Sequence, residues 1–291
     1  MYKLFMEFEN PTNAFAGEQT AVQGFAIHGS LGFVLYHTGV CGVYDLVERG
    51  SAPLGVFKLG SYNNDKSDPA HINHANDAMF GTTCEGEKFP LLYVTAGNSG
   101  VSDENGYVAY CAVEQIREND GVYSSELVQR IYYKNEGVEN TAYSAPAWGW
   151  PASLVDVEGG WFYLVGTRYR AKKEFTQPDN VYIITKFRLP KVSEGDVTFH
   201  PSDIEDQFEL PLTALFTQGG TVRDGKIWYV YGLGNEQYPD AMNVIDLQKK
   251  ELSLFEDLSH TPFASEEVEC CAFLGNKLII NTQAGRLYEK I

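Results

Sequence analysis

A short polar segment, HINHANDAMFG at residues 71–81, carries a group of side chains that could do chemistry. His71, His74 and Asp77 follow one another at intervals of three residues, and Asn76 lies among them. On a helix, this spacing would place the three side chains on one face, where they could ligate zinc. The neighbouring proline and asparagines favour a loop, so we predict no metal site. The remaining roles are to bind a polar ligand or to cap a loop.

A second candidate for chemistry is the pair of carboxylates in Glu267-Val268-Glu269. Two carboxyl groups in an apolar channel can have their pKa values driven apart, which gives an acid and a base. We expect the two side chains to point to opposite sides of the chain, with only Glu269 facing the channel. If the protein is an enzyme, Glu269 is the acid or base and His74 or Asp77 is its partner.

Other catalytic patterns are missing from the sequence. There is no G-x-S-x-G motif, no G-x-G-x-x-G motif and no Walker motif, so we predict neither a nucleotide nor another cofactor. Cys270 and Cys271 have no identifiable histidine partner. The five cysteines form no C-x-x-C pair, and we expect them to be reduced and buried.

Charge and hydropathy exclude several classes of partner. The formal net charge is −17 and the pI is about 4.7, so a nucleic-acid backbone or an anionic membrane would be repelled. No apolar run is long enough to span a bilayer, and the N-terminal residues do not resemble a signal peptide. We therefore expect a monomer without membrane insertion, located in the cytoplasm unless a leader has been removed.

The elements that must position these residues are short strands. Alternating apolar runs separated by Gly, Asn, Asp and Pro are typical of an all-β protein. One run recurs five times at intervals of roughly 50–70 residues, which is typical of propeller blades with long loops. The five runs start at Phe33, Leu91, Phe162, Ile227 and Leu278. We predict a five-bladed β-propeller that forms a single domain over residues 1–291.

Each of the first four units has two further strands after its recurrent run. In the fifth unit the chain ends after only one further strand. The segment YKLFMEFE near the N-terminus can supply the missing strand. Its pattern places Leu4, Met6 and Phe8 on one side, opposite Lys3, Phe5 and Glu7. We predict that Tyr2 to Glu9 pair with the last blade and close the ring, which removes an exposed sheet edge.

Aligning the five units brings one position of each onto the central channel. The segment before each recurrent run faces the channel of a propeller, so equivalent residues should converge on the axis. The aligned residues are Gln23, Asn76, Gln218 and Glu269, with the fifth somewhere from Trp150 to Ser153. Such polar groups can bind a ligand, or they can bond one another and channel water.

The sequence favours a carbohydrate-like ligand over the central channel. Side-chain amides offer paired donors and acceptors that suit hydroxyl groups, and an aromatic ring can stack on a sugar face or pack between blades. The predicted ligand-binding residues are Gln23, His74, Asn76, Trp150, Gln218 and Glu269. The alternatives are a hydrolase or lyase that acts on a glycan or peptide-like substrate, and a protein-interaction scaffold.

Two expectations concern the histidines of the opening segment. His74 should point into the channel with Asn76, because residues two apart in an extended chain share a side, and His71 should be more exposed. Asp77 should orient a neighbour or a backbone amide. If His74 touches the ligand, affinity should change around its ordinary pKa of about 6.5.

The repeat also resembles a known kind of propeller. Gln218-Gly219, the Asn243–Leu247 strand and Glu267-Val268-Glu269 resemble motifs of glutamine cyclotransferase-like and YVTN-like propellers, and Gln23-Gly24 repeats the first motif. The chain is also similar to uncharacterised five-bladed propellers of gut Bacteroidetes, which implies a bacterial origin. The glycine that usually follows the second glutamate is Cys270 here. The resemblance implies the fold and no particular reaction.

Overall fold

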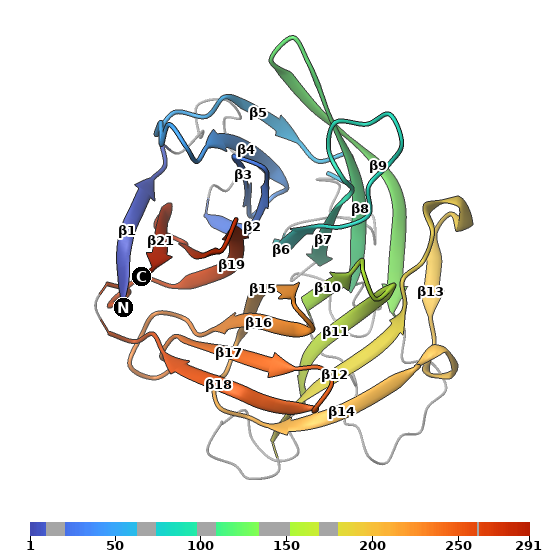
Figure 1. Ribbon diagram of the computed structural model, residues 1–291, viewed down its shortest axis with the longest axis vertical. Helices are drawn as coiled ribbons and strands as arrows, with labels where there is room; N and C mark the ends of the chain where they lie inside the picture. The colour runs from blue at the N-terminus through green and yellow to red at the C-terminus, as the bar shows by residue number, and fades with distance from the viewer. Residues whose placement is uncertain (10–20, 63–73, 98–108, 134–151, 169–179, 261) are drawn as a thin grey trace.

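Five sheets lie in a ring in the computed structural model (Figure 1), which describes residues 1–9, 21–62, 74–97, 109–133, 152–168, 180–260 and 262–291. Each sheet is an antiparallel meander, and one sheet carries an additional parallel strand. The protein is therefore a five-bladed β-propeller, as the sequence predicts. Among the described residues, no helix is both long enough and apolar enough to cross a membrane.

The blades follow one another along the chain, and each begins with its innermost strand. Blade 1 consists of β2 (Val22–His28), β3 (Leu31–Tyr36), β4 (Val40–Asp45) and β5 (Gly55–Lys58). Blade 2 consists of β6 (His74–Phe80), β7 (Leu92–Gly97), β8 (Ala109–Asn119) and β9 (Val122–Tyr133). Blade 3 consists of β10 (Ala152–Asp156), β11 (Trp161–Arg168), β12 (Val181–Arg188) and β14 (Asp206–Pro211).

The last two blades complete the ring. Blade 4 consists of β15 (Thr217–Arg223), β16 (Lys226–Tyr231), β17 (Ala241–Asp246) and β18 (Glu251–Asp257). Blade 5 consists of β19 (Val268–Leu274), β20 (Lys277–Thr282), β21 (Arg286–Lys290) and the N-terminal strand β1 (Tyr2–Glu7). The innermost strands β2, β6, β10, β15 and β19 surround the axis in Figure 1.

Some strands within a blade are connected by tight hairpins, and the residues there suit the turn. The β15–β16 turn uses Asp224 and Gly225, which have φ angles of 51° and 68°. A two-residue hairpin needs positive φ at both positions, and Asp-Gly is one of the sequences that adopts it most easily. The pair Asp120-Gly121 makes the same turn between β8 and β9, with φ angles of 51° and 81°.

The predicted closure by the N-terminal strand is confirmed. β1 pairs antiparallel with β21, from Tyr2 opposite Lys290 to Glu7 opposite Arg286. The simple alternation expected for this strand is wrong, because a register shift between Leu4 and Met6 turns the chain. As a result Phe5 and Met6 are both buried, whereas Leu4 is 52% exposed.

Blade 2 has a fifth strand that the sequence did not predict. The chain between β12 and β14 forms two short 3₁₀ turns, Val192–Glu194 and Pro201–Asp203, on either side of β13 (Val197–Phe199). β13 pairs in parallel with β9 and so ties blade 3 to blade 2. Its Phe199 ring stacks on Phe187 of β12, with centroids 4.2 Å apart.

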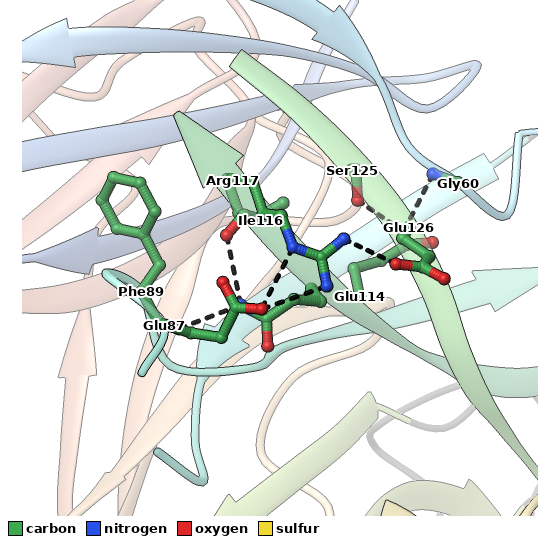
Figure 2. Close-up of polar contacts among 9 residues, drawn as sticks. Gly60, Glu87, Phe89, Glu114, Ile116, Arg117, Ser125 and Glu126 are labelled. Carbon is green, nitrogen blue, oxygen red and sulfur yellow. Dashed lines mark hydrogen bonds and ion pairs between the residues drawn. The ribbon is translucent and has the colours of Figure 1, made fainter. Parts of the chain in front are cut away.

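A buried carboxylate joins blade 1 to blade 2 (Figure 2). Glu114 of β8 accepts hydrogen bonds from the backbone N–H groups of Gly60 and Ser61, each at 2.8 Å, and from Ser125 Oγ at 2.5 Å. The chain of Gly60 runs so close that a Cβ there would lie 2.2 Å from Leu127 N. These contacts fix the position of blade 1 relative to blade 2. The convergence of the innermost strands on the axis depends on such fixed positions.

Candidate functional site

Four of the five innermost strands bulge at the position that the repeat alignment singles out. The register shifts lie between Val22 and Phe25 in β2, Ala75 and Asp77 in β6, Thr217 and Gly220 in β15, and Val268 and Cys270 in β19. A bulge inserts an unpaired residue and re-aims its side chain. Gln23, Asn76, Gln218 and Glu269 therefore occupy comparable places in their blades.

Blade 3 differs from the other four. The described part of β10 pairs with β11 from Ala152 to Asp156 without a register shift. Trp150 and His71, both singled out from the sequence, lie outside the described residues. Ser153, the other end of the range left open by the alignment, is buried, and its N–H donates to Thr95 Oγ1 at 2.8 Å.

Hydrogen bonds connect the bulge residues across the ring. Asn76 Nδ2 donates to Gln218 O at 3.0 Å, and Gln23 Nε2 donates to Glu269 Oε1 at 3.2 Å. Gln218 Nε2 donates to Glu267 Oε1 at 2.8 Å. All of these side chains except Glu267 are at most 6% exposed. We refer to Gln23, Asn76, Gln218, Glu267 and Glu269 as the polar ring.

The expectation that only Glu269 faces the channel is wrong. Glu267 bonds Gln218, Glu269 bonds Gln23, and the Glu267 charge acts on Glu269. Val268, between them, packs into the apolar cluster of blades 4 and 5. Both carboxyls therefore bond amides of the aligned bulge residues.

Asp77 is buried where three of the innermost strands meet. Its side chain is 1% exposed, and Oδ1 accepts from Ala78 N, Gly220 N and Cys270 Sγ at 2.8, 3.2 and 3.1 Å. A Cβ on Gly219 would lie 2.6 Å from this oxygen. Strands β6, β15 and β19 therefore meet tightly at this level, with Asp77 between them.

His74 lies at the edge of the polar ring and is neutral near pH 7. Its Nε2 lies 3.1 Å from Asn76 Oδ1, and its ring packs edge-on against His37 with centroids 4.2 Å apart. Burial and the neighbouring His37 lower the pKa of His74 to about 4. The expected titration around pH 6.5 is therefore wrong, because it used the unperturbed pKa of histidine and burial disfavours the charged form.

Burial favours the protonated form of the carboxyls around the ring. Burial, together with the charges of Glu267 and Asp240, raises the pKa of Glu269 well above its usual range. Burial raises the pKa of Asp240 to about 7, and it also raises the pKa of Glu267. The pKa of Asp77 rises to about 7 for the same reason, although hydrogen bonds from Cys270, Gly220 and Ala78 oppose the rise.

Asp240 was missed by sequence reasoning. It precedes β17, outside the aligned segments, and its Oδ1 accepts Gly234 N at 2.8 Å. The loop that it anchors lies against blade 5, since a Cβ on Gly234 would lie 2.7 Å from Glu267 N. No local pattern marks this approach; only the packing of blade 4 on blade 5 brings Asp240 beside the two glutamates.

Several buried oxygen atoms in this region have no hydrogen-bond partner among the described residues. They are Gln23 Oε1, Asp77 Oδ2, Asp240 Oδ2, Glu269 Oε2 and Asn281 Oδ1. Asn281, on β20, donates its Nδ2 to Gln23 O at 2.8 Å. In the part of the chain that the structure describes, no group of three His, Cys, Asp or Glu residues is arranged to hold a metal ion.

Comparisons with known proteins support the fold and leave the function open. The sequence matches no protein-family model, and no curated protein matches it significantly. The structure is similar to glutaminyl cyclase from Myxococcus xanthus, with a TM-score of 0.51 and 13% identity over 99% of this chain and 94% of that chain. The resemblance to glutaminyl cyclase-like propellers is thus confirmed at the level of fold.

A second similar structure is a protein of unknown function from Bacteroides thetaiotaomicron, with a TM-score of 0.42 and 9% identity over 99% of this chain and 74% of that chain. A third is apo AztD from Citrobacter koseri, with a TM-score of 0.34 and 12% identity over 82% of this chain and 47% of that chain. Both similarities are too weak to support an inference. The propeller fold by itself fits ligand binding or catalysis in general.

Proposed function

We propose that the protein binds a small polar ligand of carbohydrate-like chemistry at the polar ring. The observation that carries this proposal is the set of buried oxygens without partners, which gather where four blades converge. Buried polar atoms are nearly always satisfied, so this set calls for donors from outside the chain. Hydroxyl groups supply such donors, and the free Gln23 Oε1 can accept from them.

Replacing the ring amides tests this proposal. Asn76→Ala and Gln218→Ala should each weaken binding of the best ligand from a glycan screen at least tenfold, because each removes one of the amides that face the ligand. Binding would be measured by thermal shift and calorimetry on purified variants.

Both side chains also bond backbone carbonyls, so a stability control is needed. Gln129→Ala provides it, since Gln129 is a buried amide that bonds Lys191 O and Gly195 O in the outer part of blade 2. It should lower the melting temperature comparably and leave affinity unchanged. A screen without a hit, or ring variants that bind like the wild type, would contradict the proposal.

The second candidate is an enzyme in which Glu269 acts as a general acid or base. Its support is the buried carboxyl of Glu269, whose pKa is raised by burial and by the charges of Glu267 and Asp240. Such environments are common at catalytic sites and also occur in purely structural networks.

Glu269→Gln separates catalysis from binding, because the amide keeps the shape and cannot carry the proton. If the protein turns over a glycan or peptide-like substrate, this variant should lose at least about 100-fold in kcat. The matched control is Glu289→Gln, which removes a carboxyl that pairs with Lys277 on blade 5. Unchanged turnover in Glu269→Gln would exclude Glu269 as the acid or base.

A further inference from the structure

The unpartnered atoms of the polar ring share one chemical property: every one of them is an oxygen that can accept a hydrogen bond. Two of them lie on neighbouring groups, since Gln23 Oε1 and Glu269 Oε2 belong to side chains already joined by the Gln23 Nε2 to Glu269 Oε1 bond. Asn281 Oδ1 lies on a side chain bonded to the backbone of Gln23. The two amide oxygens among them, Gln23 Oε1 and Asn281 Oδ1, can only accept hydrogen bonds.

The charges around these atoms have one sign. Glu267 and Asp240 both act electrostatically on Glu269. Within the described ranges, the ion pairs of Lys and Arg involve other carboxylates and none of these three. His74 and His37 have lowered pKa values and bring no positive charge at neutral pH. The surroundings of Glu269 thus combine free acceptors with uncompensated acidic groups.

We propose that the ligand of the polar ring carries a primary ammonium group, which donates to Gln23 Oε1 and Glu269 Oε2 while Glu267 and Asp240 compensate its charge. This inference rests on the proposed function and narrows the ligand to an amino sugar or a related hydroxylated amine. An ammonium offers three N–H donors and no acceptor, which matches the unmet groups of the site. Such a charge-assisted hydrogen bond is stronger than one between neutral groups.

Binding of a cation has a consequence for protons. Burial raises the pKa of Glu269 and so favours its protonated form. A cation beside a carboxyl favours its ionised form, so the ammonium should displace that proton. Gln23 from β2 bonds Glu269, and the acidic Glu267 and Asp240 act on it electrostatically. Asn281 from β20 bonds the backbone oxygen of Gln23. Asp77 lies beyond Cys270 and has its own raised pKa.

Calorimetry with four probes tests the inference: glucosamine, glucose, N-acetylglucosamine and ethanolamine. Titrations are run at pH 7 in phosphate and in HEPES, which differ in ionisation enthalpy and contain no primary amine. Glucosamine should bind at least tenfold more tightly than the two neutral sugars and release about one proton. Glu269→Gln should weaken glucosamine binding at least tenfold and abolish the proton release. Glu251→Gln removes the same charge from an exposed site on β18 and should change neither.

The possible outcomes separate the two proposals. Equal affinity for glucose and glucosamine would overturn the ammonium inference and leave carbohydrate binding in place. Binding of ethanolamine without any sugar would overturn the carbohydrate proposal and support the ammonium. Displacement of glucosamine by K⁺ or Ca²⁺ would assign the site to an inorganic cation and overturn the ammonium inference. Failure of all four probes to bind would overturn both.

Discussion

Removal of residues 1–9 is expected to lower the melting temperature by more than 10 °C. The deletion exposes the apolar surface that Phe5, Met6 and Phe8 cover, which corresponds to about 2 kcal/mol for each side chain. It also breaks the ladder between β1 and β21 and leaves β21 as an open edge. One kcal/mol shifts the melting temperature of a domain of this size by about 2–4 °C. Scanning calorimetry of the two proteins measures the difference.

Two controls identify the cause. Leu4→Ser changes an exposed residue of the same strand and should leave the melting temperature within about 2 °C of the wild type. A synthetic peptide of residues 1–9, added in excess to the shortened protein, should restore part of the lost stability by occupying the vacant edge. An unchanged melting curve after the deletion would contradict closure of the ring by β1.

Asp77→Asn is expected to change how stability depends on pH. The pKa of Asp77 is about 7 in the folded protein, whereas the ordinary value for an unperturbed Asp is 3.8. The unfolded chain therefore loses its proton first as the pH rises, and stability that is fully present below pH 4 is lost as the pH approaches and passes 7. A shift of about three units corresponds to about 4 kcal/mol, an order-of-magnitude figure.

The asparagine cannot titrate, and its side-chain oxygen can accept the same bonds from Ala78, Gly220 and Cys270. We therefore expect urea unfolding to show that the free energy of unfolding of the variant, relative to the wild type, is several kcal/mol higher at pH 8 than at pH 4. Asp120→Asn is the matched control, because Asp120 is exposed in the β8–β9 turn and Asn also tolerates its positive φ. If the difference in the free energy of unfolding between Asp77→Asn and the wild type is the same at pH 4 and pH 8, Asp77 is ionised in the folded protein.

The repeated blades explain why so much of the fold could be predicted. Each blade repeats the same order of strands, so an alignment within one chain locates Gln23, Asn76, Gln218 and Glu269 at the bulges without any homologue. The count of strands in the last unit predicts closure in the same way. Both inferences depend on local sequence order, which the fold preserves.

What the sequence could not supply depends on contacts between blades. Asp240 reaches Glu267 only because two blades pack together, and the lowered pKa of His74 follows from burial beside His37 on another blade. β13 joins a neighbouring blade across a long excursion of the chain. The bulge in β1 overrides the alternation of its residues, so Phe5 is buried and Leu4 is exposed. Packing between segments decides each of these features, and no local sequence pattern predicts them.

The central claim is that the polar ring holds a ligand. The most direct test is a crystal structure of the protein grown with saturating glucosamine. The account predicts sugar density at the polar ring, with the amino nitrogen within hydrogen-bond distance of Gln23 Oε1 and Glu269 Oε2. A structure in which these oxygens contact only each other or ordered water, with no sugar at the ring, would contradict it.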